Sequence, residues 1–313
     1  MNVLVRSLQE TDLTAADHIF RTAFGTFLGL PDPLRFGGDT DYVRTRWRAN
    51  TEGALGAESD GAIVGSNFAT RWGSFGFFGP LTVRPDLWDH GIARLLLEPT
   101  MALFERWRTT HRGLFTFSHS PKHHALYQKF GFYPRFLTAV LGKRVSSTVT
   151  PGGLRRFSQL DRSEHDQWLA DAREVTDTLY SGLDLTHEIR VTDELRLGDT
   201  LFLDDEDRIA GFAVCHVGPH TEAGSGCCYV KFAAVRCGEH AARDFDRLLE
   251  GCEWLTVSSG AASLIAGVNL AREGAYRAVL ARGFRADLVG VAMQSPNQAG
   301  PNRPDVFALD DWR

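Results

Sequence analysis

Hydrophobic and polar residues follow two periods along this chain, one typical of strands and one typical of helices. Residues 3–8 alternate and predict a short strand, and a helix is expected from a cap at Thr11-Asp12 to about residue 24. Residues 25–39 hold too many glycines and prolines for a regular element, and 41–48 predict a second, short helix. Residues 54–59 and 62–72 flank Asp60-Gly61, which predicts a tight hairpin.

The stretch 75–132 carries the most informative pattern. It predicts a strand at 75–83, a helix at 92–108 that Pro99 kinks, a buried strand at 114–118 and a helix at 121–130, before one or two strands at 132–145. Two small residues, Gly91 and Ala93, stand where the long helix begins. They let main-chain N–H groups approach an anion, and the helix start adds about half an elementary positive charge. The pattern therefore predicts a site for the diphosphate of a nucleotide-bearing cofactor.

The order of elements repeats in the second half of the chain. The segment Thr-Val-Thr-Pro-Gly-Gly at 148–153 predicts a domain boundary. Strand-like and helical segments then follow in the same order at 154–160, 163–180, 200–217 with a turn at Asp207-Arg208, 229–235, 241–255 and 264–293. We expect a first domain at 1–147, a second at 154–294, and a tail at 295–313 that wraps the surface, with 306–312 docked on an apolar site.

The second copy lacks the residues that make the first copy a candidate for chemistry. Its turn at 236–241 is shorter, and Glu239 in that turn would repel a diphosphate. Val279 stands where the first copy has Tyr127, and Tyr276 lies off that helix face. We therefore expect the second copy to be structural or to shape the substrate site.

Composition narrows the class of protein. Of the 313 residues 43% are hydrophobic and 23% charged, as in globular proteins, and the net charge of −5 argues against nucleic acid or an anionic membrane as partner. No apolar run approaches the roughly 20 residues of a membrane helix, and residues 1–12 do not resemble a signal peptide. The five cysteines form no Cys-x-x-Cys pair, which favours reduced thiols without a metal and a cytoplasmic location.

Two groups of residues carry a resemblance to a known family. They are Val83-Arg84-Pro85 with Gly91-Ile92-Ala93-Arg94, and Ser120 with Leu126-Tyr127 and Gly131-Phe132. Over about residues 3–145 the chain resembles the GNAT superfamily of acyl-coenzyme A-dependent N-acetyltransferases. Trp88 is a departure, because the family usually has Gln or Arg there. The resemblance implies an α/β (α+β) fold of two tandem GNAT-like domains, each with a mixed, mostly antiparallel sheet flanked by helices.

The resemblance also implies an activity and a set of site residues. It implies transfer of an acetyl group from acetyl-CoA, the co-substrate, to a primary amine of a small molecule, by direct attack in a ternary complex. The helical Tyr127 would protonate the departing thiolate, and His119, just after a strand end, is a candidate base. Cofactor contacts are expected from the loop, the central strand and the following helix, at Leu81, Thr82, Val83, Asp89, His90, Gly91, Ile92, Ala93, Arg94, Ser120 and Lys129.

Several alternatives remain open in the sequence. Tyr127 is equally a packing residue by its position alone, and the base is not fixed, since His123 and His124 lie on the next helix. A metal held by His119 and His123 is disfavoured, because Pro121 begins the helix only after His119. Aromatic residues of 24–42 and Trp72 are expected to line the acceptor pocket, and Asp39 and Asp41 either hold a cationic amine or cap a helix.

Other functions fit less well or remain possible readings. A Rossmann-type enzyme is disfavoured by the absence of a Gly-x-Gly-x-x-Gly loop. A protein that binds acyl-CoA without catalysis, as a sensor, is the alternative to an enzyme, and a peptide or protein amine is a second possible acceptor. Monomer and homodimer are both compatible with two copies in one chain.

Overall fold

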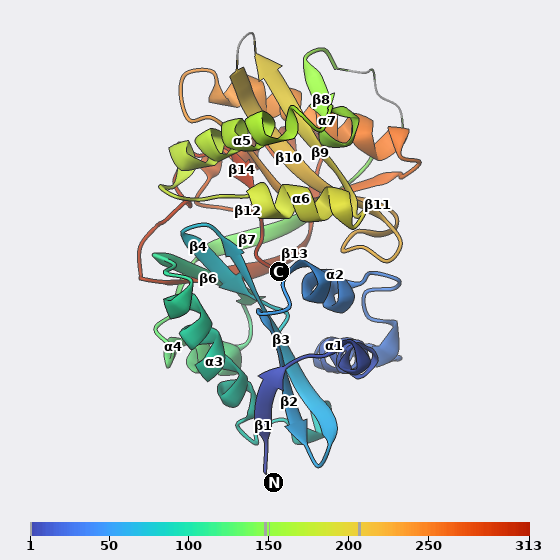
Figure 1. Ribbon diagram of the computed structural model, residues 1–313, viewed down its shortest axis with the longest axis vertical. Coiled ribbons are helices and arrows are strands. Elements are labelled where there is room, and N and C mark those ends of the chain that lie inside the picture. Colours follow the sequence, from blue (N-terminus) through green and yellow to red (C-terminus); the bar gives the residue numbers. More distant parts are fainter. Residues whose placement is uncertain (1, 147–148, 150, 206–207) are drawn as a thin grey trace.

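The computed structural model describes residues 2–146, 149, 151–205 and 208–313. Figure 1 shows two lobes stacked along the long axis, with the first copy below and most of the second copy above. The described elements of the first copy are β1 (Leu4–Ser7), α1 (Leu13–Phe27), α2 (Tyr42–Ala49), β2 (Ala54–Ser59), β3 (Ala62–Trp72), β4 (Phe75–Phe78), β5 (Thr82–Val83), α3 (Ile92–Arg106), β6 (His111–Phe117), α4 (Pro121–Gln128) and β7 (Tyr133–Arg144).

The second copy repeats this order, which confirms the predicted duplication. Its elements are β8 (Leu154–Arg156), α5 (His165–Leu179), α6 (Thr186–Glu194), β9 (Gly198–Asp205), β10 (Arg208–Gly218), β11 (Gly224–Val235), α7 (Ala241–Ser258), β12 (Ser263–Asn269), α8 (Glu273–Ala281), β13 (Arg285–Ser295) and β14 (Ala308–Leu309). Asp207 of the predicted turn lies outside the described residues, and so do Thr148 and Thr150 of the predicted boundary.

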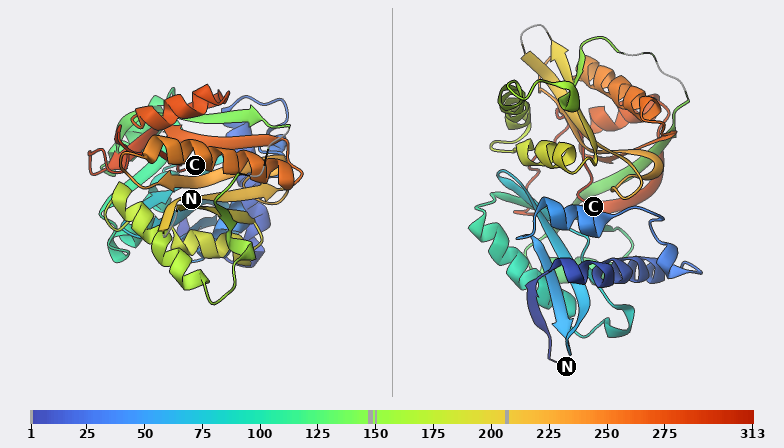
Figure 2. Two further views of the ribbon diagram at one scale, coloured as in Figure 1. Left: turned by 90° about the horizontal axis from the view of Figure 1, so that it is seen from above. Right: turned by 45° about the vertical axis from the view of Figure 1, so that its right-hand side comes forward.

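One sheet runs through both lobes because the copies exchange their last strands. Among the described residues its order is β1-β2-β3-β4-β6-β13-β7-β12-β11-β10-β9-β8, with β5 on β3 and β14 on β11. The last strand of the first copy, β7, pairs with β12 of the second, and β13 of the second copy pairs with β6 of the first. Figure 2 shows β7 and β13 side by side where the lobes meet. The domain limits 1–147 and 154–294 remain a prediction, and strand pairing crosses them.

Apolar side chains fill both faces of this sheet. In the first copy a core of Leu96, Phe104 and Phe132 packs under α3. Between the lobes, Trp72 packs against Phe77 of the first copy and Phe232 of the second. The ring centroids of these two pairs are 4.6 Å and 5.5 Å apart. No helix of the described residues is long and apolar enough to cross a membrane.

The hairpin prediction is confirmed, whereas the single central strand at 75–83 is wrong in its middle. Asp60 and Gly61 have φ of 51° and 79°, as a two-residue turn between β2 and β3 needs. At the predicted central strand, the N–H of Gly79 donates to Phe68 O (2.8 Å) and that of Arg84 to Val64 O (2.9 Å). Five steps along one strand thus match four along β3, so an extra residue is bulged out and the strand splits into β4 and β5.

Candidate functional site

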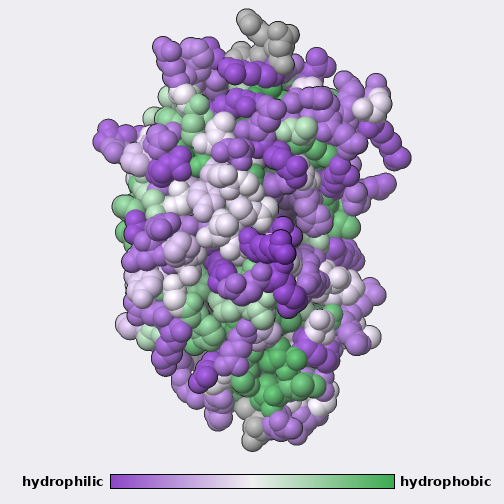
Figure 3. Space-filling model, turned by 60° about the vertical axis from the view of Figure 1, so that its left-hand side comes forward, coloured by the Kyte–Doolittle hydropathy of each residue, from purple (hydrophilic) through white to green (hydrophobic). Residues whose placement is uncertain are grey.

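A cavity of about 890 Å³ opens in the first copy between β5, the C-terminal end of α1, the N-terminal part of α3 and the length of α4. Figure 3 turns this side of the molecule forward and shows hydrophobic side chains gathered on the lower lobe among polar ones. The cavity is lined by most of the predicted site residues, namely Leu81, Thr82, Val83, Asp89, Gly91, Ile92, Ala93, Arg94, Tyr127 and Lys129.

The start of α3 offers main-chain donors to this cavity. Gly91 caps the helix with a φ of 80°, a left-handed conformation that favours glycine. In the part of the chain that the structure describes, no hydrogen bond is donated by the main-chain N–H groups of 89–93. The indole Nε1 of Trp88 donates to Val83 O (2.8 Å) and ties the loop to the end of β5. Trp88 thus holds the loop, while the unpaired N–H groups at a helix start form a ready anion site.

Charged side chains at the mouth are paired but exposed. Lys122 pairs with Asp89 (2.5 Å) and Arg94 with Glu98 (3.0 Å), and all four side chains are at least 49% exposed. Exposed ion pairs contribute only about 0–1 kcal/mol, so an incoming phosphate can displace the carboxylate partner at low cost.

The split between β4 and β5 opens a gap in the sheet beside the cavity. β4 pairs in parallel with β6 only from Phe75 to Phe77, whereas β5 pairs with β3. Since the N–H of Arg84 faces β3 and successive N–H groups of a strand point to opposite sides, the N–H of Val83 faces away from β3.

Tyr127 lies on the wall of the cavity in the last turn of α4. Its side chain is 8% exposed, and its ring packs 5.8 Å from that of Phe78. Burial raises the pKa of the Tyr127 phenol, so the hydroxyl stays protonated and can donate. The position agrees with both earlier readings, a proton donor and a packing ring.

The histidines fall into two groups. His119 is exposed and lies outside the cavity lining, with its ring stacked 5.9 Å from that of Phe27. His123 lines the cavity, 5.2 Å from Phe27 and 6.4 Å from Tyr127 between ring centroids. Burial, with the charge of Lys122 second, lowers the pKa of His123, so its imidazole is neutral and able to accept a proton.

Sequence reasoning left His123 and His124 as open alternatives to His119, because adjacent positions on a short helix face different ways and only the docked helix shows which of them meets the cavity. Two predicted contacts also lie outside the lining. His90 bonds through Nδ1 to Trp88 O (2.9 Å), and Ser120 is buried at the start of α4. Within the described residues no group of three or more His, Cys, Asp or Glu is placed to hold a metal ion.

Only part of the expected acceptor pocket is found at the cavity. Phe24 and Phe27 of α1 line it, and Phe36 stacks on Phe24 at 5.1 Å. Trp72 lies instead in the core between the lobes, because its indole packs on Phe77 and Phe232. Of the two acids, Asp41 caps α2 by accepting from Arg44 N (2.9 Å), and Asp39 accepts from Ser225 N (2.9 Å).

In the second copy the matching gap is filled by the chain's own tail. β11 pairs in parallel with β12 only as far as Val230, and beyond it β14 pairs with β11 at Ala233 and Ala234. The fully buried Arg272 holds the tail in place by donating to Ala308 O (3.1 Å) and to Asp310 (2.8 Å). The first part of the tail lies at the surface, where 296–298 and 304–305 are exposed, and Val306, Leu309 and Trp312 dock in apolar surroundings, as expected.

Both the sequence and the fold are similar to those of known proteins. Residues 18–132 match the model of the acetyltransferase (GNAT) family. No curated protein matches the sequence. Many solved structures share the fold, three of them as follows. An acetyltransferase candidate from Pyrococcus horikoshii is 14% identical with a TM-score of 0.70, over 99% of this chain and 95% of that one.

The other two cover the chain almost as fully. A GCN5-related N-acetyltransferase from Sphaerobacter thermophilus is 14% identical (TM-score 0.59; 94% of this chain, 95% of that one). A tandem GNAT protein from the clavulanic acid biosynthesis pathway is 12% identical (TM-score 0.56; 94% and 98%). The whole chain therefore has the tandem fold.

Proposed function

Residues 18–132 of this chain belong to the acetyltransferase (GNAT) family, and on that premise we propose that the protein moves an acetyl group from acetyl-CoA to a primary amine of a small molecule. The observation that carries the proposal is the row of unpaired N–H groups at 89–93, next to the split between β4 and β5. A helix start of this kind suits a diphosphate, and the split leaves room beside Val83 for the acyl end.

The first copy's residues divide the work of binding. The N–H groups of 89–93 hold the diphosphate, and Lys122 and Arg94 neutralise it after leaving Asp89 and Glu98. The space beside Gly91 is open to the diphosphate, because a Cβ built there would meet no atom within 4 Å. Only its φ of 80° restricts this position to glycine. The apolar wall of Phe24 and Phe27 keeps water from the reacting end.

Chemistry requires three further roles. Acetyl-CoA supplies an acyl thioester, whose C–S bond breaks as the new C–N bond forms. The N–H of Val83 donates to the acyl oxygen as negative charge builds on it. Tyr127 gives its proton to the departing sulfur, and the neutral imidazole of His123, or else the predicted base His119, takes a proton from the attacking amine.

Two measurements on the full chain test the proposal. Calorimetric titration with coenzyme A should show binding, and acetyl-CoA with a panel of small primary amines should release free thiol at a rate that depends on the amine. Binding without thiol release from any amine would favour the acyl-CoA sensor. Absence of binding would refute the cofactor site itself.

A further inference from the structure

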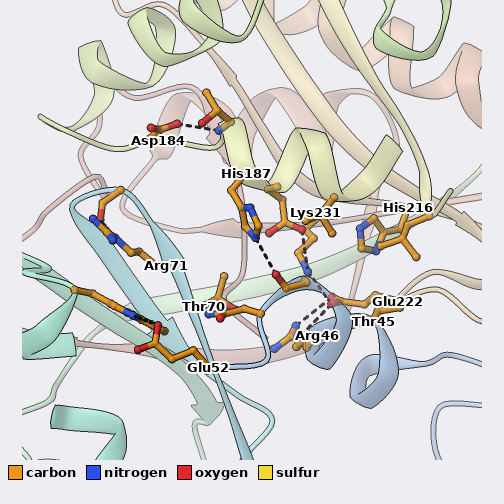
Figure 4. Close-up of a pocket in the computed structure, with 18 residues that line it drawn as sticks. Thr45, Arg46, Glu52, Thr70, Arg71, Asp184, His187, His216, Glu222 and Lys231 are labelled. Carbon is orange, nitrogen blue, oxygen red and sulfur yellow. Dashed lines mark hydrogen bonds and ion pairs between the residues drawn. The ribbon is translucent and has the colours of Figure 1, made fainter. Parts of the chain in front are cut away.

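A second cavity, of about 330 Å³, lies between the two copies and has no part in the proposed transfer reaction. Figure 4 shows that its walls come from both lobes, with Arg46 on α2 and Arg71 on β3 from the first copy, and His187 on α6, His216 on β10 and Lys231 on β11 from the second. Its volume is near the lower end of the range for small-molecule pockets, about 300–1,000 Å³.

Buried charges form the inner wall of this cavity. Arg46 binds Glu222 through two nitrogens at 3.0 Å and 3.1 Å, and Lys231 lies 2.7 Å from Glu222 and 3.6 Å from Glu188. The four side chains are at most 7% exposed. Two cations and two carboxylates make a wall with no net charge, so a ligand with a net charge would enter at a high electrostatic cost.

His216 is the unsatisfied group in this wall. It is 1% exposed, it lines the cavity, and neither ring nitrogen has a hydrogen-bond partner in the described structure. Buried polar groups without a partner cost about 1–3 kcal/mol each and are rare in native structures. Burial, with the charge of Lys231 second, lowers the pKa of His216 to about 4. The neutral ring therefore offers one donor and one acceptor to whatever fills the cavity.

Two further side chains have hydrogen-bonding capacity left. Glu188 accepts from the indole of Trp72 (3.1 Å) through one oxygen, and its other oxygen has only the distant Lys231. Arg71 donates from Nε to Gly73 O (3.1 Å) and has no ion-pair partner among the described residues. Arg71 and Gly73 also line a groove on the surface, which gives the cavity an entrance.

From these groups we infer that the cavity between the copies binds a free α-amino acid. Its carboxylate faces Arg71 at the entrance, its ammonium group faces Glu188, and a polar group of its side chain meets His216. A zwitterion matches a wall of both signs and adds no net charge to a neutral buried network. A small carboxylate alone leaves the second oxygen of Glu188 without a close donor, and a small amine alone leaves Arg71 without an acceptor.

The test uses the full chain without acetyl-CoA. The midpoint of thermal unfolding and the heat of titration are measured with each common protein amino acid, and with propionate and ethylamine, which carry one charged group each. At least one amino acid should raise the unfolding temperature by mass action, and both single-charge probes should not. If no amino acid binds, or if propionate or ethylamine binds as tightly as the amino acid, the inference is wrong.

A variant then ties binding to this cavity. His216→Leu removes both orphan nitrogens at similar volume, so the variant should fold and should weaken binding of the amino acid by at least about tenfold. His18→Gln, at an exposed histidine of α1, is the control and should bind like the parent. In the parent chain the imidazole nitrogen NMR signals of His216 should shift on titration. Unchanged affinity in His216→Leu, or unshifted signals during binding, would place the ligand elsewhere and overturn the assignment.

Discussion

At the scale of single residues, Tyr127 decides between an enzyme and a sensor. Replacing it with Phe keeps the ring against Phe78 and removes only the hydroxyl. We predict that kcat for the best amine falls by about 10²–10⁴, the usual contribution of a general acid, while the Kd of coenzyme A is unchanged. Steady-state thiol release and titration calorimetry measure the two. Tyr133→Phe, at a tyrosine 45% exposed, is the matched control; equal kcat in Tyr127→Phe and the parent would leave the tyrosine as a packing residue.

The pH dependence of the reaction tests His123 as the base. Burial lowers the pKa of His123, so its neutral form persists to lower pH than that of an ordinary histidine at about 6.5. As pH rises, kcat/KM should climb through this lowered pKa and level off below the ordinary value, if the imidazole is the base. His123→Gln should remove that limb from the pH profile, and His119→Gln should keep it. The reverse result would assign the base to His119.

At the scale of elements, the pattern of the sequence predicted what is local and missed what depends on distant partners. The hairpin at Asp60-Gly61 and the start of α3 at Gly91 follow from residues next to each other. The break in the strand at 75–83 arises because the paired stretch of β3 is one residue shorter than the stretch it pairs with. The local pattern of 75–83 holds no information about this partner. The exchange of β7 and β13 has the same cause, because alternation fixes the buried face of a strand and leaves its neighbour open.

The split strand is held open by a contact that crosses the lobes, and this leads to a prediction. Arg46 donates to the carbonyl of Gly79, the last residue before the bulge, and its other nitrogens bind Glu222 of the second copy. Arg46→Met leaves the buried Glu222 with Lys231 alone, so we predict a loss of about 3–5 kcal/mol in the free energy of unfolding. Urea unfolding measures this loss. We also predict that kcat falls, because the opening between β4 and β5 relaxes.

A double-mutant cycle separates this pair from simple loss of packing. Adding Glu222→Leu to Arg46→Met removes the stranded carboxylate, so the double variant should be more stable than the sum of the single changes by about 0.5–3 kcal/mol. Arg35→Met breaks an ion pair whose side chains are 86% and 56% exposed, and it should change stability by less than about 1 kcal/mol. Strict additivity in the cycle would show that Arg46 and Glu222 do not act together.

At the scale of the whole molecule, the two copies share one fold but are not equivalent. Neither lobe has a complete sheet of its own, because β7 and β13 each finish the other copy's sheet. The gap that serves the proposed cofactor site in the first copy is taken by β14 in the second. Position 127 is a tyrosine at a cavity wall, whereas Val279 at the matching position is fully buried.

The filled gap predicts that one chain binds one molecule of coenzyme A, which titration calorimetry reads as a stoichiometry of one. Ala93→Glu places a negative charge beside the diphosphate and should weaken binding by at least about tenfold. An acidic residue in the first turn stabilises a helix, so the variant should keep its fold. Ala242→Glu makes the same change at the second residue of α7, where it should leave the affinity unaltered. A stoichiometry of two, or binding lost in Ala242→Glu and kept in Ala93→Glu, would mean that the second copy binds coenzyme A and that the tail leaves its gap. Such a result would contradict the structure, in which the buried Arg272 holds the tail through Ala308 and Asp310.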